Sequence, residues 1–166
     1  MGETKRQARA VRHKETPMKT TNQAASIRRA KLQDVPAIKH CIDQAYAPVK
    51  KRLADLPDVS AGLEEDVEKN VVLVAETGSK IAGCAILEMN GGVAHLMNIA
   101  VDPAFKGLGL GKMLLAAVED TAIRNGVREL HLATHVGMPE NVSLYTHLGW
   151  SETSRNSNKV LMKKEI

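Results

Sequence analysis

The chain has 166 residues, of which 43% are hydrophobic and 25% are charged, as is usual for one soluble globular domain. Aromatic residues make up only 2%, which argues against a base-stacking surface for nucleic acid. The net charge of +4 comes from residues 1–24, which contain six basic and two acidic residues and leave 17 of each in the rest, so the remainder has no basic surplus for a polyanionic partner.

Residues 1–24 are polar, basic and without hydrophobic periodicity, so we expect a disordered extension followed by a single domain over residues 25–166. The two cysteines, Cys41 and Cys84, are too few for a disulfide framework. No apolar run approaches the ~18 residues of a membrane span. We therefore expect a cytoplasmic protein that binds neither membranes nor nucleic acid. A homodimer remains open.

The first half of the domain predicts a strand, two helices, a shorter helical piece and a three-strand meander. Asp34 is the expected N-cap of the first helix, in which apolar residues recur every three or four positions. Pro48 is expected to end that helix, because proline removes a backbone hydrogen bond. The expected segments are strand 26–30, helices 35–47 and 49–56, a helical piece near 63–68, and strands 71–76, 80–90 and 93–101.

The second half predicts a glycine-rich loop, two helices and three strands. The expected segments are helix 108–125, strand 128–134, helix 139–147, and strands 150–153 and 159–163. Gly126 follows the longer helix, as is typical of a helix C-terminus. The complete order is β-α-α-β-β-β-α-β-α-β-β, which predicts a mixed α/β domain.

The glycine-rich loop reads Lys106-Gly107-Leu108-Gly109-Leu110-Gly111-Lys112 and lies directly before the expected helix. The first N–H groups of a helix have no partner within it, and the aligned peptide dipoles add positive charge there. Glycines at alternate positions let an anion approach the backbone closely. The loop therefore predicts a phosphate site.

Two common phosphate motifs do not fit this loop. A P-loop has the pattern Gly-x-x-x-x-Gly-Lys-Ser/Thr. With its Gly-Lys pair placed on Gly111-Lys112, it requires Gly at 106 and Ser or Thr at 113, but Lys106 and Met113 occupy those positions. The dinucleotide motif Gly-x-Gly-x-x-Gly meets Lys112 or Leu114 where it requires a small residue. A nucleotide hydrolase and a dinucleotide-binding domain are therefore not expected.

The strand and loop together resemble the GNAT superfamily of acyl-coenzyme A N-acyltransferases. The family loop is Gln/Arg-x-x-Gly-x-Gly/Ala after a strand ending in Ala-Val-x-Pro, and Ala100-Val101-Asp102-Pro103 precedes the loop here. Lys106 departs from the pattern, since lysine keeps the charge but lacks the planar fork of arginine. Downstream, residues 141–150 resemble the family's Asn-x-x-Ala-x-x-Leu-Tyr-x-x-x-Gly-Phe/Tyr region with compact spacing. The resemblance covers about residues 26–163.

This resemblance implies the GNAT fold, a mixed and mostly antiparallel sheet whose fourth and fifth strands splay apart around acetyl-CoA. Acetyl-CoA would be the cosubstrate, and no metal is implied. His131 and His135 do not suggest one, because four strand residues span ~13 Å. The expected coenzyme-binding residues are Ile99, Ala100, Val101, Lys106, Gly107, Leu108, Gly109, Leu110, Gly111, Lys112, Asn141 and Tyr145.

The implied reaction is direct attack of an amine on the thioester. Tyr145 is the expected general acid, because a phenol is protonated at neutral pH and can donate to the leaving thiolate. His95 is the expected base, and strand alternation places it on one face with Met97 and Ile99, opposite Leu96, Asn98 and Ala100. Water or Glu88 is the alternative base. Tyr46 and Glu88 are expected at the acceptor pocket.

Three functions are compatible with this sequence. The first is an N-acetyltransferase that acts on a small amine. The second is the same enzyme acting on a peptide or protein N-terminus or lysine. The third is a catalytically inactive acyl-CoA-binding sensor or interaction module.

Overall fold

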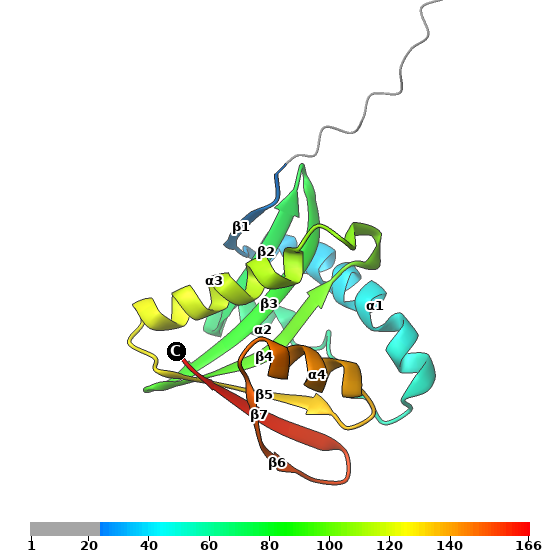
Figure 1. The fold of residues 1–166 in the computed structure, drawn as a ribbon. Helices are drawn as coiled ribbons and strands as arrows, with labels where there is room; N and C mark the ends of the chain where they lie inside the picture. Colours follow the sequence, from blue (N-terminus) through cyan, green and yellow to red (C-terminus); the bar gives the residue numbers. More distant parts are fainter. Residues whose placement is uncertain (1–23) are drawn as a thin grey trace, which may run out of the picture.

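The computed structural model describes residues 24–166, so the extension predicted for residues 1–24 lies outside the described residues except for its last residue. One seven-stranded sheet has the order β1-β2-β3-β4-β5-β7-β6, and only the β4–β5 pair is parallel (Figure 1). The strands are β1 Ser26–Arg29, β2 Val71–Thr77, β3 Lys80–Asn90, β4 Val93–Val101, β5 Glu129–His135, β6 Ser151–Arg155 and β7 Lys159–Glu165.

Helices lie on both faces of this sheet (Figure 1). They are α1 Val35–Arg52, α2 Leu63–Lys69, α3 Leu110–Arg124 and α4 Pro139–His147, with 3-10 turns at Leu32–Asp34 and Pro103–Phe105. The order of elements confirms the predicted mixed α/β architecture. No helix among residues 24–166 is both long and apolar enough to cross a membrane.

The first helix is longer than predicted. The expectation that Pro48 ends it is wrong, because α1 continues through Pro48 to Arg52 and replaces the two separate helices expected there. A proline inside a helix removes one hydrogen bond. Ile38 and Ile42 are fully buried against the sheet before the proline, and beyond it Arg52 contacts the Gly137 carbonyl and Glu140.

The sheet separates two apolar layers. One layer packs under α1 and α2 and includes Val72, Val74 and Ile86. The other packs under α3 and α4 and includes Leu73, Leu87 and Leu114. Neighbouring strand residues point to opposite faces, so the alternation along β2 and β3 divides them between the layers.

The register of β4 contains one extra residue. Leu96 pairs with Leu87 and Asn98 pairs with Ile86, which leaves Met97 as a β-bulge. Beyond the bulge, each side chain of β4 points to the face opposite to the one that regular alternation would give it. Leu96 therefore belongs to the α3 layer, whereas Asn98 contacts α1. The expectation that these two residues share a face is wrong.

The parallel pair β4–β5 is short. Pairing begins at Val93 with Glu129 and ends at Leu96 with Leu132, although both strands continue beyond that point. The predicted splay between the fourth and fifth strands is therefore present, and it begins at the bulge.

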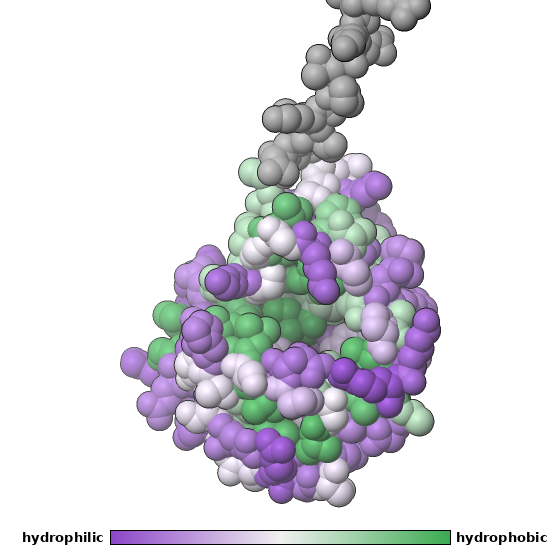
Figure 2. All heavy atoms as spheres, turned by 45° about the vertical axis from the view of Figure 1, so that its right-hand side comes forward, coloured by the Kyte–Doolittle hydropathy of each residue, from purple (hydrophilic) through white to green (hydrophobic). Residues whose placement is uncertain are grey.

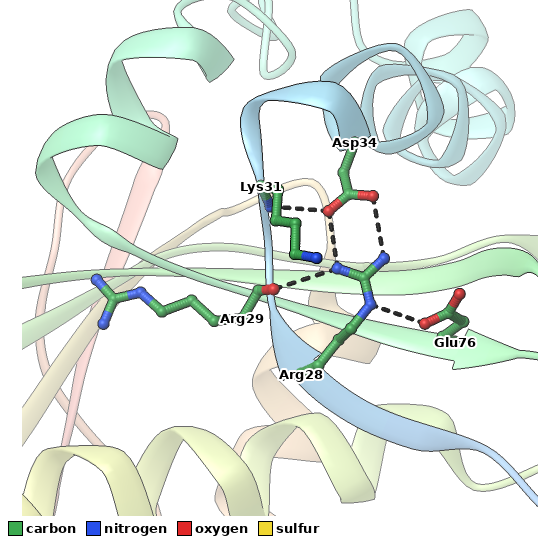
Figure 3. Close-up of polar contacts among 5 residues, drawn as sticks. All are labelled: Arg28, Arg29, Lys31, Asp34 and Glu76. Atoms are coloured by element: carbon green, nitrogen blue, oxygen red, sulfur yellow. Dashed lines mark hydrogen bonds and ion pairs between the residues drawn. The ribbon is translucent and has the colours of Figure 1, made fainter.

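An ion cluster ties β1 to the start of α1 (Figure 3). The Arg28 guanidinium donates to both Asp34 carboxylate oxygens, at 2.8 and 3.0 Å, and to Glu76 at 2.7 Å. The Lys31 backbone N–H donates to Asp34 at 2.7 Å. Asp34 is the N-cap residue of α1, as predicted, but its carboxylate makes no capping bond to the helix because it is used in this cluster.

We predict that Asp34→Asn lowers the free energy of unfolding by about 1–3 kcal/mol at pH 7, because a charge-assisted bidentate bond is lost. The Arg28 guanidinium holds the pKa of Asp34 below its ordinary value in the folded state. That stabilisation is present above the unfolded pKa of ~3.9 and is lost as pH falls through the folded pKa.

Urea unfolding measured at a series of pH values checks this prediction. The wild-type and Asp34→Asn curves should converge in acid, while Asp43→Asn, which breaks the exposed pair with Lys39, should change stability by less than about 0.5 kcal/mol. A difference between wild type and Asp34→Asn that stays constant down to pH 2 would contradict the account.

Candidate active site

A cavity of about 780 Å³ lies where β4 and β5 part. Its walls come from the 53–62 loop between α1 and α2, from residues 96–101 of β4, from the glycine-rich loop, and from the ends of β5 and α4. Figure 2 shows a hollow with a hydrophobic floor and hydrophilic residues around its mouth. The splay therefore gives access from the surface to the middle of the sheet.

The glycine-rich loop forms one end of this cavity. Asp102 accepts a hydrogen bond from the Ala104 N–H at 2.9 Å, which fixes the turn that leaves β4. Gly107 and Gly109 have φ values of 83° and 72°, a region that favours glycine. A Cβ atom at Gly107, Gly109 or Gly111 would meet no other atom within 4 Å. The backbone is thus bare toward the cavity.

The start of α3 adds unpaired donors at the same place. In α3, Met113 N–H donates to the Gly109 carbonyl at 3.1 Å, so the amides of residues 110–112 precede the first intrahelical bond. Lys106 and Lys112 also line the cavity. Bare backbone, free N–H groups and two cationic side chains fit a pyrophosphate group.

Tyr145 lies in the cavity wall on α4. Its side chain is buried, and its ring packs edge-on against Trp150 at a centroid distance of 5.8 Å. Among the hydrogen bonds of residues 24–166, none engages its hydroxyl. Burial, with a smaller effect of Tyr46, raises the pKa of Tyr145 above its ordinary value. The phenol is therefore protonated at neutral pH and has a free O–H.

Tyr46 also lines the cavity but uses its hydroxyl. It donates to Asn98 Oδ1 at 3.0 Å, and Asn98 Nδ2 donates to the Val59 carbonyl at 3.3 Å. Burial raises the pKa of Tyr46 to about 12. The two phenols thus differ: that of Tyr46 is held in a structural network, whereas that of Tyr145 is available.

The 53–62 loop and the end of α1 are fastened to the end of β5 and to α4 beside the cavity. His135 Nε2 lies 3.0 Å from both Asp55 carboxylate oxygens, and His135 Nδ1 accepts the Gly137 N–H at 2.9 Å. Because Nδ1 is an acceptor, Nε2 carries the proton and donates to Asp55. Arg52 adds an ion pair with Glu140 at 2.5 Å.

Most of the predicted coenzyme-binding residues line one cavity. These are Ile99, Ala100, Val101, Lys106, Gly107, Gly109, Leu110, Gly111, Lys112, Asn141 and Tyr145, together with the predicted acceptor residue Tyr46. Leu108 is 44% exposed and is not part of the wall, and Glu88 also lies outside it.

His95 does not reach the cavity. Its pairing partner is Glu88, and its ring lies 5.4 Å from that of His131 in a neighbouring hollow of about 230 Å³. Ile99 packs against the α3 layer instead. The expectation that His95 and Ile99 share a face is wrong, because the Met97 bulge lies between them.

The residues that hold the 53–62 loop beside the cavity were not identified from the sequence. Asn98, Asp55 and His135 act through contacts 39 to 80 residues apart in the chain. One signal was available for Asn98, since a carboxamide in an otherwise apolar strand requires polar partners. No local pattern identifies the partners themselves.

Comparison with known proteins agrees with this geometry. Residues 39–150 match the family model described as the acetyltransferase (GNAT) family. This match covers more than half of the chain, so the protein belongs to that family. The enzyme class and family resemblance predicted from the sequence are thereby confirmed.

Curated relatives include the [ribosomal protein bS18]-alanine N-acetyltransferase of Salmonella typhimurium, 36% identical over 89 residues, which are 54% of this chain and 59% of the relative. The chain thus spans just over half the length of that relative. The IAA acetyltransferase of Azospirillum brasilense is 24% identical over 82% of this chain and 86% of its own.

Solved structures share the fold. The ribosomal-protein-S18-alanine N-acetyltransferase of Escherichia coli has a TM-score of 0.73 at 25% identity, over 86% of this chain and 94% of its own. The PaiA N-acetyltransferase of Thermoplasma acidophilum, solved in complex with coenzyme A, has a TM-score of 0.71 at 17% identity, over 86% of this chain and 99% of its own.

The coenzyme site can be tested with glutamate substitutions at two glycines that have similar positive φ values, of 72° and 64°. We predict that Gly109→Glu weakens coenzyme A binding at least about 100-fold, because a carboxylate would project into the phosphate end of the cavity. Gly91→Glu is the control, since Gly91 also has a positive φ, of 64°, and open space, but lies in the β3–β4 turn.

Isothermal titration with coenzyme A compares the two variants with wild type. Equal affinity of Gly109→Glu and Gly91→Glu would show that the glycine-rich loop does not hold the phosphates.

Proposed function

We propose that this protein transfers an acetyl group from acetyl-CoA to a primary amine by direct attack. The observation that carries the proposal is the single cavity that joins the bare start of α3 to the free hydroxyl of Tyr145 through the β4–β5 splay. An anionic carrier fits one end, and an acid is available near the other.

The residues fit acetyl-CoA in a definite direction. Its pyrophosphate would lie on the backbone of residues 107–112 with Lys106 and Lys112 nearby. The pantetheine arm would follow residues 99–101, which β5 leaves unpaired, and would bond to them in the manner of a strand. The Ile99 N–H would then donate to the oxyanion, and Asn141 would contact the arm. The bound coenzyme supplies an activated thioester.

The chemical step forms one bond and breaks one. The amine nitrogen bonds to the thioester carbon, the C–S bond breaks, and the thiolate receives a proton from Tyr145. Burial raises the pKa of Tyr145 and so keeps the phenol protonated until the thiolate forms, and the tyrosinate left by the transfer regains a proton from solvent. The acceptor nitrogen loses its proton to water.

A proton route through water favours an acceptor with a low pKa. An N-terminal α-amine has a pKa of ~7.7–8.0 and a lysine side chain ~10.4, so at pH 7 the neutral fraction of the α-amine is larger by roughly a few hundredfold. Two relatives are named as ribosomal-protein-S18-alanine N-acetyltransferases, and alanine has no amine other than its α-amine, which supports the same choice. We propose the α-amine of a peptide or protein as the acceptor.

A thiol-release assay tests the function. Wild-type protein with acetyl-CoA should release free coenzyme A when an alanine-initiated peptide is added. A peptide with a blocked N-terminus and one lysine should give far less release. Tyr145→Phe should lower kcat about 100-fold and change coenzyme affinity little, because only the acid is lost.

Tight coenzyme binding by wild type without release for any amine would instead identify an acyl-CoA-binding module. Unchanged kcat in Tyr145→Phe, with chemistry rate-limiting, would remove Tyr145 as the acid.

His95→Ala is predicted to change kcat/KM by less than about twofold and to leave its pH profile unaltered. The reason is that the His95 ring lies in the hollow beside His131 and not in the cavity wall. The profile of wild type should rise with the neutral fraction of the acceptor amine. A tenfold loss in His95→Ala, together with a shifted acidic limb, would place His95 on the proton route.

A further inference from the structure

Asn98 is a buried carboxamide in a strand of apolar residues, with 8% of its surface exposed. Both ends of its amide are used. The Val59 carbonyl can only accept, so Nδ2 must face it, and Oδ1 is left to accept from the Tyr46 hydroxyl. The orientation of the amide is therefore determined by its two partners.

These bonds connect the 53–62 loop to β4. The loop lines the cavity with Asp55, Leu56, Pro57 and Val59. Other hydrogen bonds of the loop are internal, as between Ser60 and Asp58, join it to α1, as between Lys39 and Ser60, or are exposed, as between Asp55 and His135. Among the described residues, the Asn98–Val59 bond thus forms the part-buried link from this loop to the strand beneath.

The Met97 bulge explains why Asn98 can serve this loop. Without the bulge, Asn98 would share the face of Leu96 and point into the α3 layer. With it, the Asn98 side chain turns toward α1, while the next residue, Ile99, packs on the α3 side and lies in the cavity wall. Adjacent residues therefore face the loop and the proposed thioester site.

We propose that Asn98 is a positioning residue for the acceptor. Its hydrogen bonds to Val59 and Tyr46 hold the 53–62 loop in a fixed position relative to β4, so that an amine bound at this loop lies next to the thioester. This inference rests on the proposed acetyl transfer. The coenzyme is held by other elements, so loss of the tether should affect the acceptor and spare the coenzyme.

Asn98→Asp tests the tether with little change in size. A carboxylate still accepts from Tyr46 but cannot donate to the Val59 carbonyl. Loss of one buried hydrogen bond corresponds to about a tenfold effect, so acceptor KM should rise about tenfold while the Kd for coenzyme A stays within twofold. Asn98→Ser removes the same bond without a buried charge and covers the case in which Asn98→Asp does not fold.

The matched control is Asn70→Asp, the same change at a residue bonded to Asp66 at the end of α2. It should leave both constants unchanged. Tyr46→Phe should raise acceptor KM less than either Asn98 variant, because the bond to Val59 remains.

Amide hydrogen exchange gives a readout that does not depend on activity. Exchange of residues 53–62 should accelerate about tenfold in the Asn98 variants and not in Asn70→Asp. If wild type transfers no acetyl group, the proposed function fails, while exchange still reports whether the tether exists. Unchanged exchange and unchanged KM in a folded Asn98 variant would overturn the inference, as would equal losses of acceptor and coenzyme affinity.

Discussion

The parting of β4 from β5 is the constraint on which the rest of this structure depends. Four residue pairs join the two strands, and the backbone beyond Leu96 and Leu132 has no partner across the gap. Unpaired N–H and C=O groups inside a protein are costly unless something else bonds to them. A sheet opened at its centre therefore implies a ligand that completes it, and the cavity of about 780 Å³ lies there.

In the proposed reaction, the elements on the two sides of the gap would hold different substrates. On the α3 side, the glycine-rich loop exposes backbone donors and two lysines, which suit phosphate. On the α1 side, the 53–62 loop is fastened by Asn98 and by the Asp55–His135 pair. Tyr145 lies between them with a free, protonated phenol. This division explains how a carrier and an acceptor can meet from separate directions.

The sequence was sufficient for the fold and for most of the residues that line the cavity, because both rest on local patterns. The order of the elements follows from hydrophobic periodicity. The conformation of the glycine-rich loop follows from its glycines, because glycine tolerates positive φ. Tyr145 and Asn141, expected from the family resemblance of residues 141–150, both line the cavity. Pro48 was misjudged because one lost hydrogen bond does not end the helix here, and the contacts of Arg52 with Gly137 and Glu140 join residues far apart in the chain.

The acceptor end could not be predicted in the same way. A single inserted residue, Met97, reverses which side chains of β4 face which layer, and no propensity identifies a bulge in an apolar strand. His95 was placed beside Ile99 for that reason. The contacts of Asn98 and His135 join residues far apart in the chain, so their partners become visible only in the folded structure.

The measurement that tests the central claim most directly is a crystal structure with acetyl-CoA bound. The account predicts pyrophosphate oxygens on the backbone amides of residues 107–112, the pantetheine arm bonded along residues 99–101, and the thioester sulfur within hydrogen-bond distance of the Tyr145 hydroxyl. A coenzyme bound outside the β4–β5 gap, or a thioester remote from Tyr145, would contradict it.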